Sequence, residues 1–180
     1  MIWVDCAFEA HAEAMLAIFN EAIVTSTALY DHEPRTLNDM QVWFAAKAAG
    51  DFPVIGVTSS TGELMGFATY GTFRAWAGYQ HTVEHSVYVH REHRRQGLAR
   101  QLMLKLQARA QSQHKHVMVG VIDASNHASI DLHRQLGFTH SGTLREAGFK
   151  FGRWLDVEFH QLTLPSAPSL SNPAPHGKAN

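Results

Sequence analysis

Apolar residues recur along the chain with two different periods, and each period predicts a different kind of element. Residues 2–6 form a short β-prone run. Met15, Ile18, Phe19 and Ala22 then follow the i, i+3, i+4, i+7 spacing of a helix with one buried face. The pattern therefore predicts a strand followed by a helix at the start of the domain.

A long loop and a second helix are expected next. Residues 25–35 break the helical period and include Pro34, and an interhelical loop of this length is often functional. Thr36 or Asn38 is placed to cap a helix that ends at Gly50. The apolar positions of this helix are Val42, Trp43 and Ala46.

The middle of the chain changes to β-prone runs. Residues 54–59 and 64–70 are separated by Ser60-Thr61-Gly62, which has the composition of a hairpin turn. Residues 71–80 form a connection that leads into a strand at 81–89. An amphipathic helix follows, with its apolar stripe on Leu98, Leu102 and Leu106.

The last third repeats the alternation of strand and helix. Residues 116–122 are nearly all apolar, which is typical of a strand covered on both faces. A short helix at 128–136 precedes two strands, at about 139–144 and 154–164. Residues 165–180 are rich in Pro and Ser and cannot bury a face, so we expect one domain over 1–164 and a disordered tail.

Composition narrows the class of protein. An apolar share of 45% is enough for a core within one domain, and a net charge of −1 argues against a nucleic-acid partner. No run is apolar enough to span a membrane, so no membrane association is expected. The single cysteine, Cys6, excludes an internal disulfide and favours the cytoplasm.

The most informative segment is the turn between the strand at 81–89 and the helix that starts near Leu98. It is basic and contains Gly97, and the free N–H groups and dipole of a helix start favour a bound phosphate. Gly97 and Ala99 leave room for close approach. The sequence lacks the glycine patterns of Rossmann and Walker sites, which argues against those two kinds of phosphate site.

Residues 94–99, Arg-Arg-Gln-Gly-Leu-Ala, match the [Arg/Gln]-x-x-Gly-x-[Gly/Ala] signature of the GNAT superfamily of acetyltransferases. Further blocks at 82–89, 126–129, 133–138 and 150–156 resemble its phosphinothricin and methionine-sulfoximine N-acetyltransferase branch. The similarity covers about residues 2–164. One departure is Ala99, where close relatives usually have Gly, although the superfamily pattern permits Ala.

The resemblance implies an α/β (α+β) fold, with a mixed twisted sheet of about six to seven strands, splayed central strands and flanking helices. It implies acetyl-CoA as the donor, a homodimer, and detoxification of herbicide-like amino acids. The cofactor-binding residues that it implies lie on one strand and in the turn, with two on the following short helix: Val87, Tyr88, Val89, Arg94, Arg95, Gln96, Gly97, Leu98, Ala99, Arg100, Asn126 and Ser129.

Acyl transfer to an amine also needs a group that accepts a proton. Glu84 lies three residues before Val87 on the same strand and is our hypothesis for that base; a surface glutamate is the alternative. His133 lies four residues before Gly137, where the superfamily often has a tyrosine that protonates the departing thiolate. A neutral histidine packed against CoA is the other interpretation of His133.

The acceptor side is expected to carry a cation for the substrate carboxylate. Arg74, just before the strand that bears Glu84, fits this role, and a solvated loop arginine is the alternative. The substrate-binding residues that we predict are Tyr30, Arg74, Ala75, Trp76, Glu84, His85 and Ser86. His85, His90 and His93 lack a matching carboxylate or cysteine set in the sequence, so no metal is expected.

Three hypotheses of function follow. The leading one is an N-acetyltransferase that moves the acetyl group of acetyl-CoA to the α-amine of phosphinothricin, methionine sulfoximine or methionine sulfone. A second enzyme would acetylate another amine, such as a protein N-terminus, a polyamine or an antibiotic. The third is a non-catalytic acetyl-CoA sensor, against which the presence of Glu84 argues.

Overall fold

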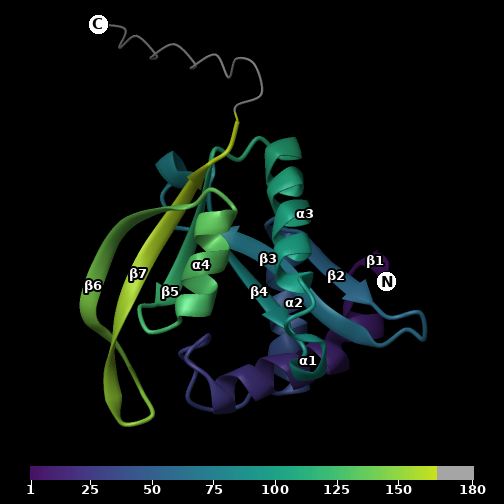
Figure 1. Ribbon diagram of the computed structural model, residues 1–180. Helices are drawn as coiled ribbons and strands as arrows, with labels where there is room; N and C mark the ends of the chain where they lie inside the picture. The colour runs from purple at the N-terminus through teal and green to yellow at the C-terminus, as the bar shows by residue number, and fades with distance from the viewer. Residues whose placement is uncertain (166–180) are drawn as a thin grey trace, which may run out of the picture.

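One mixed sheet, built from strands along the whole chain, organises the molecule (Figure 1). The computed structural model describes residues 1–165. Seven strands of this part pair in the order β1-β2-β3-β4-β5-β7-β6, and all neighbours are antiparallel except β4 and β5. The strands are β1 Ile2–Asp5, β2 Val54–Thr58, β3 Leu64–Thr72, β4 Thr82–Val89, β5 Val117–Asp123, β6 Thr139–Lys150 and β7 Arg153–Thr163.

Helices cover both faces of the sheet. α1 (Phe8–Thr25) and α2 (Leu37–Ala49) lie on one face, and α3 (Leu98–Ser112) and α4 (His127–Gln135) lie on the other. Two short 3₁₀ turns, η1 (Ala77–Tyr79) and η2 (Arg91–His93), flank β4. The expected mixed sheet with flanking helices is confirmed.

The predicted faces of the two long helices are confirmed. On α1, Met15, Ile18 and Phe19 are buried, and the Phe19 ring meets Phe67 and Tyr88 with centroids 5.0 and 4.9 Å apart. On α3 the stripe of Leu98, Leu102 and Leu106 is buried against the opposite face of the sheet. Burial of each such side chain contributes roughly 1.5–3 kcal/mol.

The second helix begins as expected but buries a different face. Thr36 caps it, accepting a hydrogen bond from the Asp39 N–H, while the Asp39 carboxylate accepts one from the Thr36 N–H. Its buried residue is Met40, and Val42 is 64% exposed. The prediction is therefore wrong for Val42 and Ala46, which are exposed, and holds for Trp43, because α2 meets the core through Met40, Trp43 and Phe44.

The last third differs from the prediction in two places. β5 is not covered throughout, because Val121 is 39% exposed where β4 turns away from it. β6 continues to Lys150, beyond the predicted end at Leu144, and its register with β7 shifts after His140 and after Leu144. These irregularities interrupt the alternation by which the sequence would have shown the longer strand.

The domain prediction had two parts, a folded domain and a C-terminal tail, and the structure describes the first part. Residues 1–164 form the described fold, whereas the tail expected over 165–180 lies outside the described residues except for Pro165. Within the described part, no helix combines the length and the apolar character needed to cross a bilayer.

Candidate active site

β4 and β5 run together for only three residue pairs before they separate. Parallel pairing joins residues 82–84 to 117–119 and stops, although the strands continue to Val89 and Asp123. Each keeps its outer neighbour, β3 or β7, over this stretch. The facing edges have no strand partner within residues 1–165, and in Figure 1 the β5–β7–β6 half of the sheet turns away from the β1–β4 half.

The separation opens a cleft of about 230 Å³. Four segments contribute to it: the loop after α1, the end of β4, the end of β5 and the start of α4. Its lining residues are Thr27, Ala28, Leu29, Tyr30, Glu84, His85, Ser86, Val87, Tyr88, Gly120, Val121, Ile122, Asp123, Asn126, Ser129 and His133.

The pleat of β4 sends successive side chains to opposite sides of this cleft. Glu84, Ser86 and Tyr88 share one face, where Tyr88 packs on Phe67 beneath α1. His85 lies on the other face, against His133 of α4. Glu84 therefore lies on the side of the loop between α1 and α2, called the first loop below, and His85 lies on the side of α3 and α4.

Glu84 combines partial burial with two nearby cations. Burial raises the pKa of the Glu84 carboxyl, and the positive charges of Arg74 and Lys47 oppose the rise without cancelling it. A carboxylate whose pKa lies above its ordinary range is better matched to proton transfer near neutral pH. The sequence had placed Arg74 here but not Lys47.

Lys47 reaches this region from α2. Its Nζ donates a hydrogen bond to the Tyr70 carbonyl at 2.8 Å, and burial lowers its pKa to about 8. Gly71, the residue that pairs with Glu84 across the sheet, leaves the space that Nζ occupies, since a Cβ there would lie 3.3 Å from it. A lysine on a mostly exposed helix gives no sequence signal of such a position.

His133 and His85 form a buried pair beneath the cleft. The His133 Nδ1 is 2.6 Å from the Ser129 carbonyl, so Nδ1 carries the proton and donates. The bare Nε2 then accepts from the His85 Nε2, 3.1 Å away. Burial lowers the pKa of both imidazoles, that of His85 to about 3, so both rings are neutral at physiological pH.

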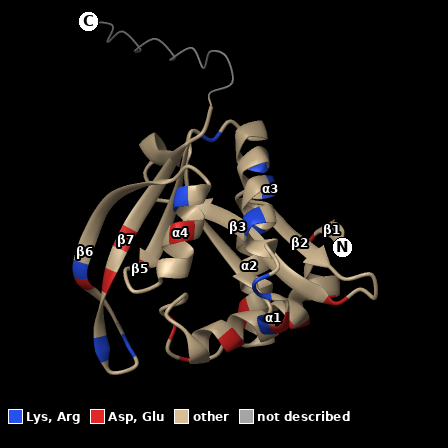
Figure 2. Ribbon diagram, in the orientation of Figure 1, with Lys and Arg blue, Asp and Glu red and all other residues tan. Residues whose placement is uncertain are grey.

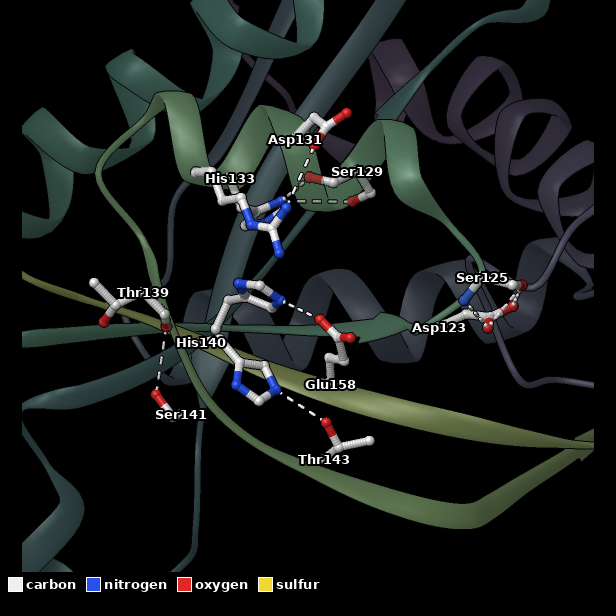
Figure 3. A network of polar contacts seen from close by, with 12 residues as sticks. Asp123, Ser125, Ser129, Asp131, His133, Thr139, His140, Ser141, Thr143 and Glu158 are labelled. Carbon is white, nitrogen blue, oxygen red and sulfur yellow. Dashed lines mark hydrogen bonds and ion pairs between the residues drawn. The ribbon is translucent and has the colours of Figure 1, made fainter.

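This arrangement bears on the two interpretations of His133. Its proton-bearing Nδ1 is held by the Ser129 carbonyl (Figure 3), and its Nε2 is bonded to His85. A proton donor to a thiolate needs a proton that it can release, so the geometry favours the packing role. Asn126, expected beside it, caps α4 by accepting a hydrogen bond from the Ser129 N–H, which leaves its amide nitrogen for a ligand.

Residues of β6 hold the first loop in place through two sets of contacts. The Lys150 Nζ donates hydrogen bonds to the Ser26 and Leu29 carbonyls, and the Tyr30 ring packs on Gly148, where a Cβ would lie 2.6 Å from it. These contacts place Tyr30 at the mouth of the cleft.

Asp123, at the end of β5, makes the second attachment. Its carboxylate accepts hydrogen bonds from the Ser125 hydroxyl (Figure 3) and from the Thr27 hydroxyl. Burial alone would raise the pKa of Asp123, but these bonds outweigh it, and the pKa lies below its ordinary value. Asp123 is therefore a charged anchor for the loop and is not poised to exchange a proton.

The expected phosphate cradle, residues 94–100, lies at the far end of β4. Gly97 has φ +76°, and no atom lies within 4 Å of the position of a Cβ there. No side chain of the described residues caps α3, so its first N–H groups remain available to an anion. Ala99 lies inside the helix, where glycine is not required, and Figure 2 shows basic residues along α3 and in the loop before it.

A second cavity lies beside this cradle. Arg94, Arg95, Gly97, Leu98, Ala99 and Arg100 line it together with Val89 and with Leu132 and Gln135. Arg94 also forms an ion pair with Glu21 of α1. Gln96 is exposed and does not line the cavity.

The three expected loop residues lie outside the cleft lining. Arg74 is exposed, stacks its guanidinium over the Phe73 ring at 4.2 Å and donates to the Phe73 carbonyl. Ala75 is exposed too, and Trp76 is 71% exposed. Arg74 is close enough to Glu84 for its charge to act on that carboxyl.

Comparisons with known proteins agree with this geometry. Residues 14–138 match the model of the acetyltransferase (GNAT) family. The L-methionine sulfoximine/L-methionine sulfone acetyltransferase of Pseudomonas paraeruginosa is 45% identical over 159 residues, which is 88% of this chain and 91% of that protein.

Two solved structures extend the likeness to the fold. A protein of Acinetobacter baylyi superposes with a TM-score of 0.91 at 53% identity, covering 92% of both chains. A phosphinothricin acetyltransferase of Sinorhizobium meliloti, solved with acetyl-CoA, has a TM-score of 0.87 at 29% identity, covering 91% of this chain and 88% of that one.

The contact between His85 and His133 depends on Gly120 of β5, a residue that the sequence did not single out. A Cβ at Gly120 would lie 2.9 Å from the Nε2 atoms of both rings. We expect Gly120→Ala to lower the free energy of unfolding by about 1–3 kcal/mol, the usual cost of overpacking a core. Urea denaturation measures this.

Gly78→Ala is the matched control, because nothing lies within 4 Å of a Cβ there and its φ is not positive. It should change stability by no more than about 0.5 kcal/mol. Equal stability of the two variants would contradict the tight packing around Gly120.

Proposed function

This chain belongs to the GNAT family of acetyltransferases, and we propose that it acetylates the α-amine of small amino acids such as methionine sulfoximine, methionine sulfone and phosphinothricin. The observation that carries the proposal is the cleft between β4 and β5, with a partly buried carboxylate, Glu84, beside cations on its acceptor side. Acetylation of such amino acids would make the protein a detoxifying enzyme.

The donor-binding residues fit acetyl-CoA, which supplies an acetyl group activated as a thioester. The free edge of β4 over residues 85–89 offers backbone groups that a pantetheine chain can pair with, as an added strand would. The open space over Gly97 and the uncapped N–H groups of α3 suit the pyrophosphate. We propose that Val87, Tyr88 and Val89 bind the pantetheine part and that residues 94–100 bind the phosphates.

The chemical step requires a neutral amine. The amine nitrogen forms a bond to the acetyl carbon, the bond from that carbon to sulfur breaks, and the nitrogen loses one proton. We assign the acceptance of this proton to Glu84, directly or through a water. The thiolate is a fair leaving group without protonation, so the step does not depend on a proton from His133.

The acceptor's carboxylate needs a cation, and the structure offers two near Glu84. The Lys47 ammonium is already bonded to the Tyr70 carbonyl and has a pKa lowered to about 8. Arg74 is always charged and has donors left over from its single bond to Phe73. We therefore propose Arg74 as the carboxylate-binding residue, with Tyr30 and Ser86 lining the acceptor space.

We also propose that two copies of the chain pair through the β6–β7 hairpin. Large apolar side chains are exposed along it: Leu144 at 54%, Phe149 at 46%, Phe151 at 56% and Trp154 at 61%. The rings of Phe149 and Trp154 contact each other with centroids 4.9 Å apart and form one exposed apolar patch. A patch of this kind is typical of an interface.

The role of Glu84 is tested by Glu84→Gln. Because the carboxylate must be ionised to accept a proton, turnover should rise with pH through the raised pKa of Glu84. The variant should lose this acid limb and at least about tenfold in turnover, while acetyl-CoA affinity stays the same. Steady-state kinetics over a pH series and calorimetry measure both.

Glu13→Gln, on the exposed surface of α1, is the control and should keep the parent's pH profile. If Glu84→Gln also kept that profile and the parent's turnover, Glu84 would be a structural residue.

The acceptor class is tested by thiol release with a panel of amines. The parent should act best on methionine sulfoximine, methionine sulfone or phosphinothricin. Arg74→Ala should weaken the reaction with these carboxylates by roughly 1.5–3 kcal/mol in kcat/KM, about 10- to 150-fold. Amines without a carboxylate should lose much less.

Arg109→Ala serves as the control, because Arg109 pairs with Asp5 on the outer side of α3. A parent active only on peptide N-termini, polyamines or antibiotics would favour the second enzyme hypothesis. A parent that binds acetyl-CoA but acetylates none of the panel would favour the sensor.

The dimer is tested by Trp154→Glu, which places a charge in the exposed apolar surface of the hairpin. The parent should sediment as a dimer at micromolar concentration and the variant as a monomer, since a buried unpaired charge is costly. Val42→Glu, at a 64% exposed site on α2, should remain dimeric. A monomeric parent would contradict the proposal.

A further inference from the structure

Three ligand-type side chains meet at the end of β4, outside the cleft. Glu63 comes from the turn between β2 and β3, His90 follows β4 directly, and His93 ends η2. One ligand atom of each lies within 4.8 Å of those of the other two. The His93 Nε2 is 3.3 Å from a carboxylate oxygen of Glu63.

The backbone of all three is fixed by local hydrogen bonds. The His90 N–H donates to the Met65 carbonyl at 2.9 Å, which continues the β3–β4 ladder and places His90 beside Glu63. The His93 N–H donates to the His90 carbonyl at 2.8 Å and closes the η2 turn. The Glu63 N–H donates to the Ser59 hydroxyl at 3.1 Å. The set is therefore held in place without any ligand.

Two of its nitrogen atoms are buried without a hydrogen bond. Among residues 1–165, the His90 Nδ1 and the His93 Nε2 have no hydrogen-bond partner, and the Glu63 oxygen near His93 is not aligned as one. An unsatisfied buried polar atom costs about 1–3 kcal/mol. A bound cation would satisfy these atoms, and Glu63, with a side chain 51% exposed, leaves the set accessible from solvent.

We propose that Glu63, His90 and His93 bind a divalent transition cation of the Zn²⁺ type. Two imidazoles and one carboxylate suit Zn²⁺ and Co²⁺, whereas Mg²⁺ and Ca²⁺ prefer oxygen ligands alone. Bonds of about 2.0–2.1 Å place the ligand atoms of a tetrahedral zinc site about 3.4 Å apart. The pair of His93 and Glu63 already has this spacing, and rotation of the exposed Glu63 side chain completes the set.

The expectation that no metal binds depended on the absence of a matching carboxylate. The fold supplies that carboxylate from Glu63, which is distant in sequence, and it removes His85 from the set, because His85 pairs with His133 under the cleft. His93 also lines the cavity of the phosphate cradle. A cation here would clamp the β2–β3 turn to the turn that precedes the cradle.

The test is calorimetric titration of the full chain with ZnCl₂, after chelator treatment and without an affinity tag. One Zn²⁺ should bind per chain with micromolar or tighter affinity and raise the melting temperature. CoCl₂ should give the visible absorption of a tetrahedral site. Glu63→Gln and His93→Gln should each weaken Zn²⁺ binding at least about tenfold and remove the rise in melting temperature.

His116→Gln is the matched control, because His116 is an exposed histidine outside the set, and it should bind Zn²⁺ as the parent does. Glu63 lies in an exposed turn, so its variant keeps the fold, which circular dichroism checks. Absence of one-to-one binding in the micromolar range would overturn the proposal. So would equal affinity in the parent and in both ligand variants.

Discussion

The separation of β4 from β5 is the constraint on which the rest of the structure depends. Pairing ends at Glu84 and Val119, and beyond this point two strands present backbone groups to each other across a gap. A buried backbone group without a partner costs free energy comparable to a lost hydrogen bond. The gap must therefore stay open to solvent or to a ligand, and Val121, half-exposed in the middle of an apolar strand, shows that it does.

Side chains on the two faces of β4 have different surroundings next to this gap. Because β4 alternates, Glu84 faces the first loop and α2, where cations surround it, while His85 faces α4 and is packed with His133. The two histidines are neutral and bonded to each other, so they support the wall of the cleft. In the reaction that we propose, Glu84 accepts the proton, while Asp123 of the same cleft is bonded to the first loop.

Short-range sequence patterns predicted some parts of the fold and of the site. The cap at Thr36, the stripe of α3 and the glycine turn before it were visible because each depends on residues a few positions apart. Lys47, Gly120 and Glu63 were not, because each matters only through a partner distant in sequence. Val42 and Ala46 of α2 were misassigned for the same reason, since what covers a helix decides which of its apolar residues is buried.

The electrostatics around Glu84 show why such long-range partners matter for the chemistry. Burial makes the charged form of the carboxyl unfavourable and raises its pKa, and Arg74 and Lys47 limit that rise. The balance leaves the pKa above its ordinary value, which brings the carboxyl closer to the pH at which a base must work. The positive charge of Lys47 is itself pH-dependent, because burial lowers the pKa of this lysine to about 8. As pH rises through that value the lysine loses its charge, and the limit on the pKa of Glu84 then falls mainly to Arg74, whose charge persists. In the function that we propose, the Arg74 guanidinium acts on both Glu84 and the substrate carboxylate, which makes a loop arginine outside the cleft lining part of the site.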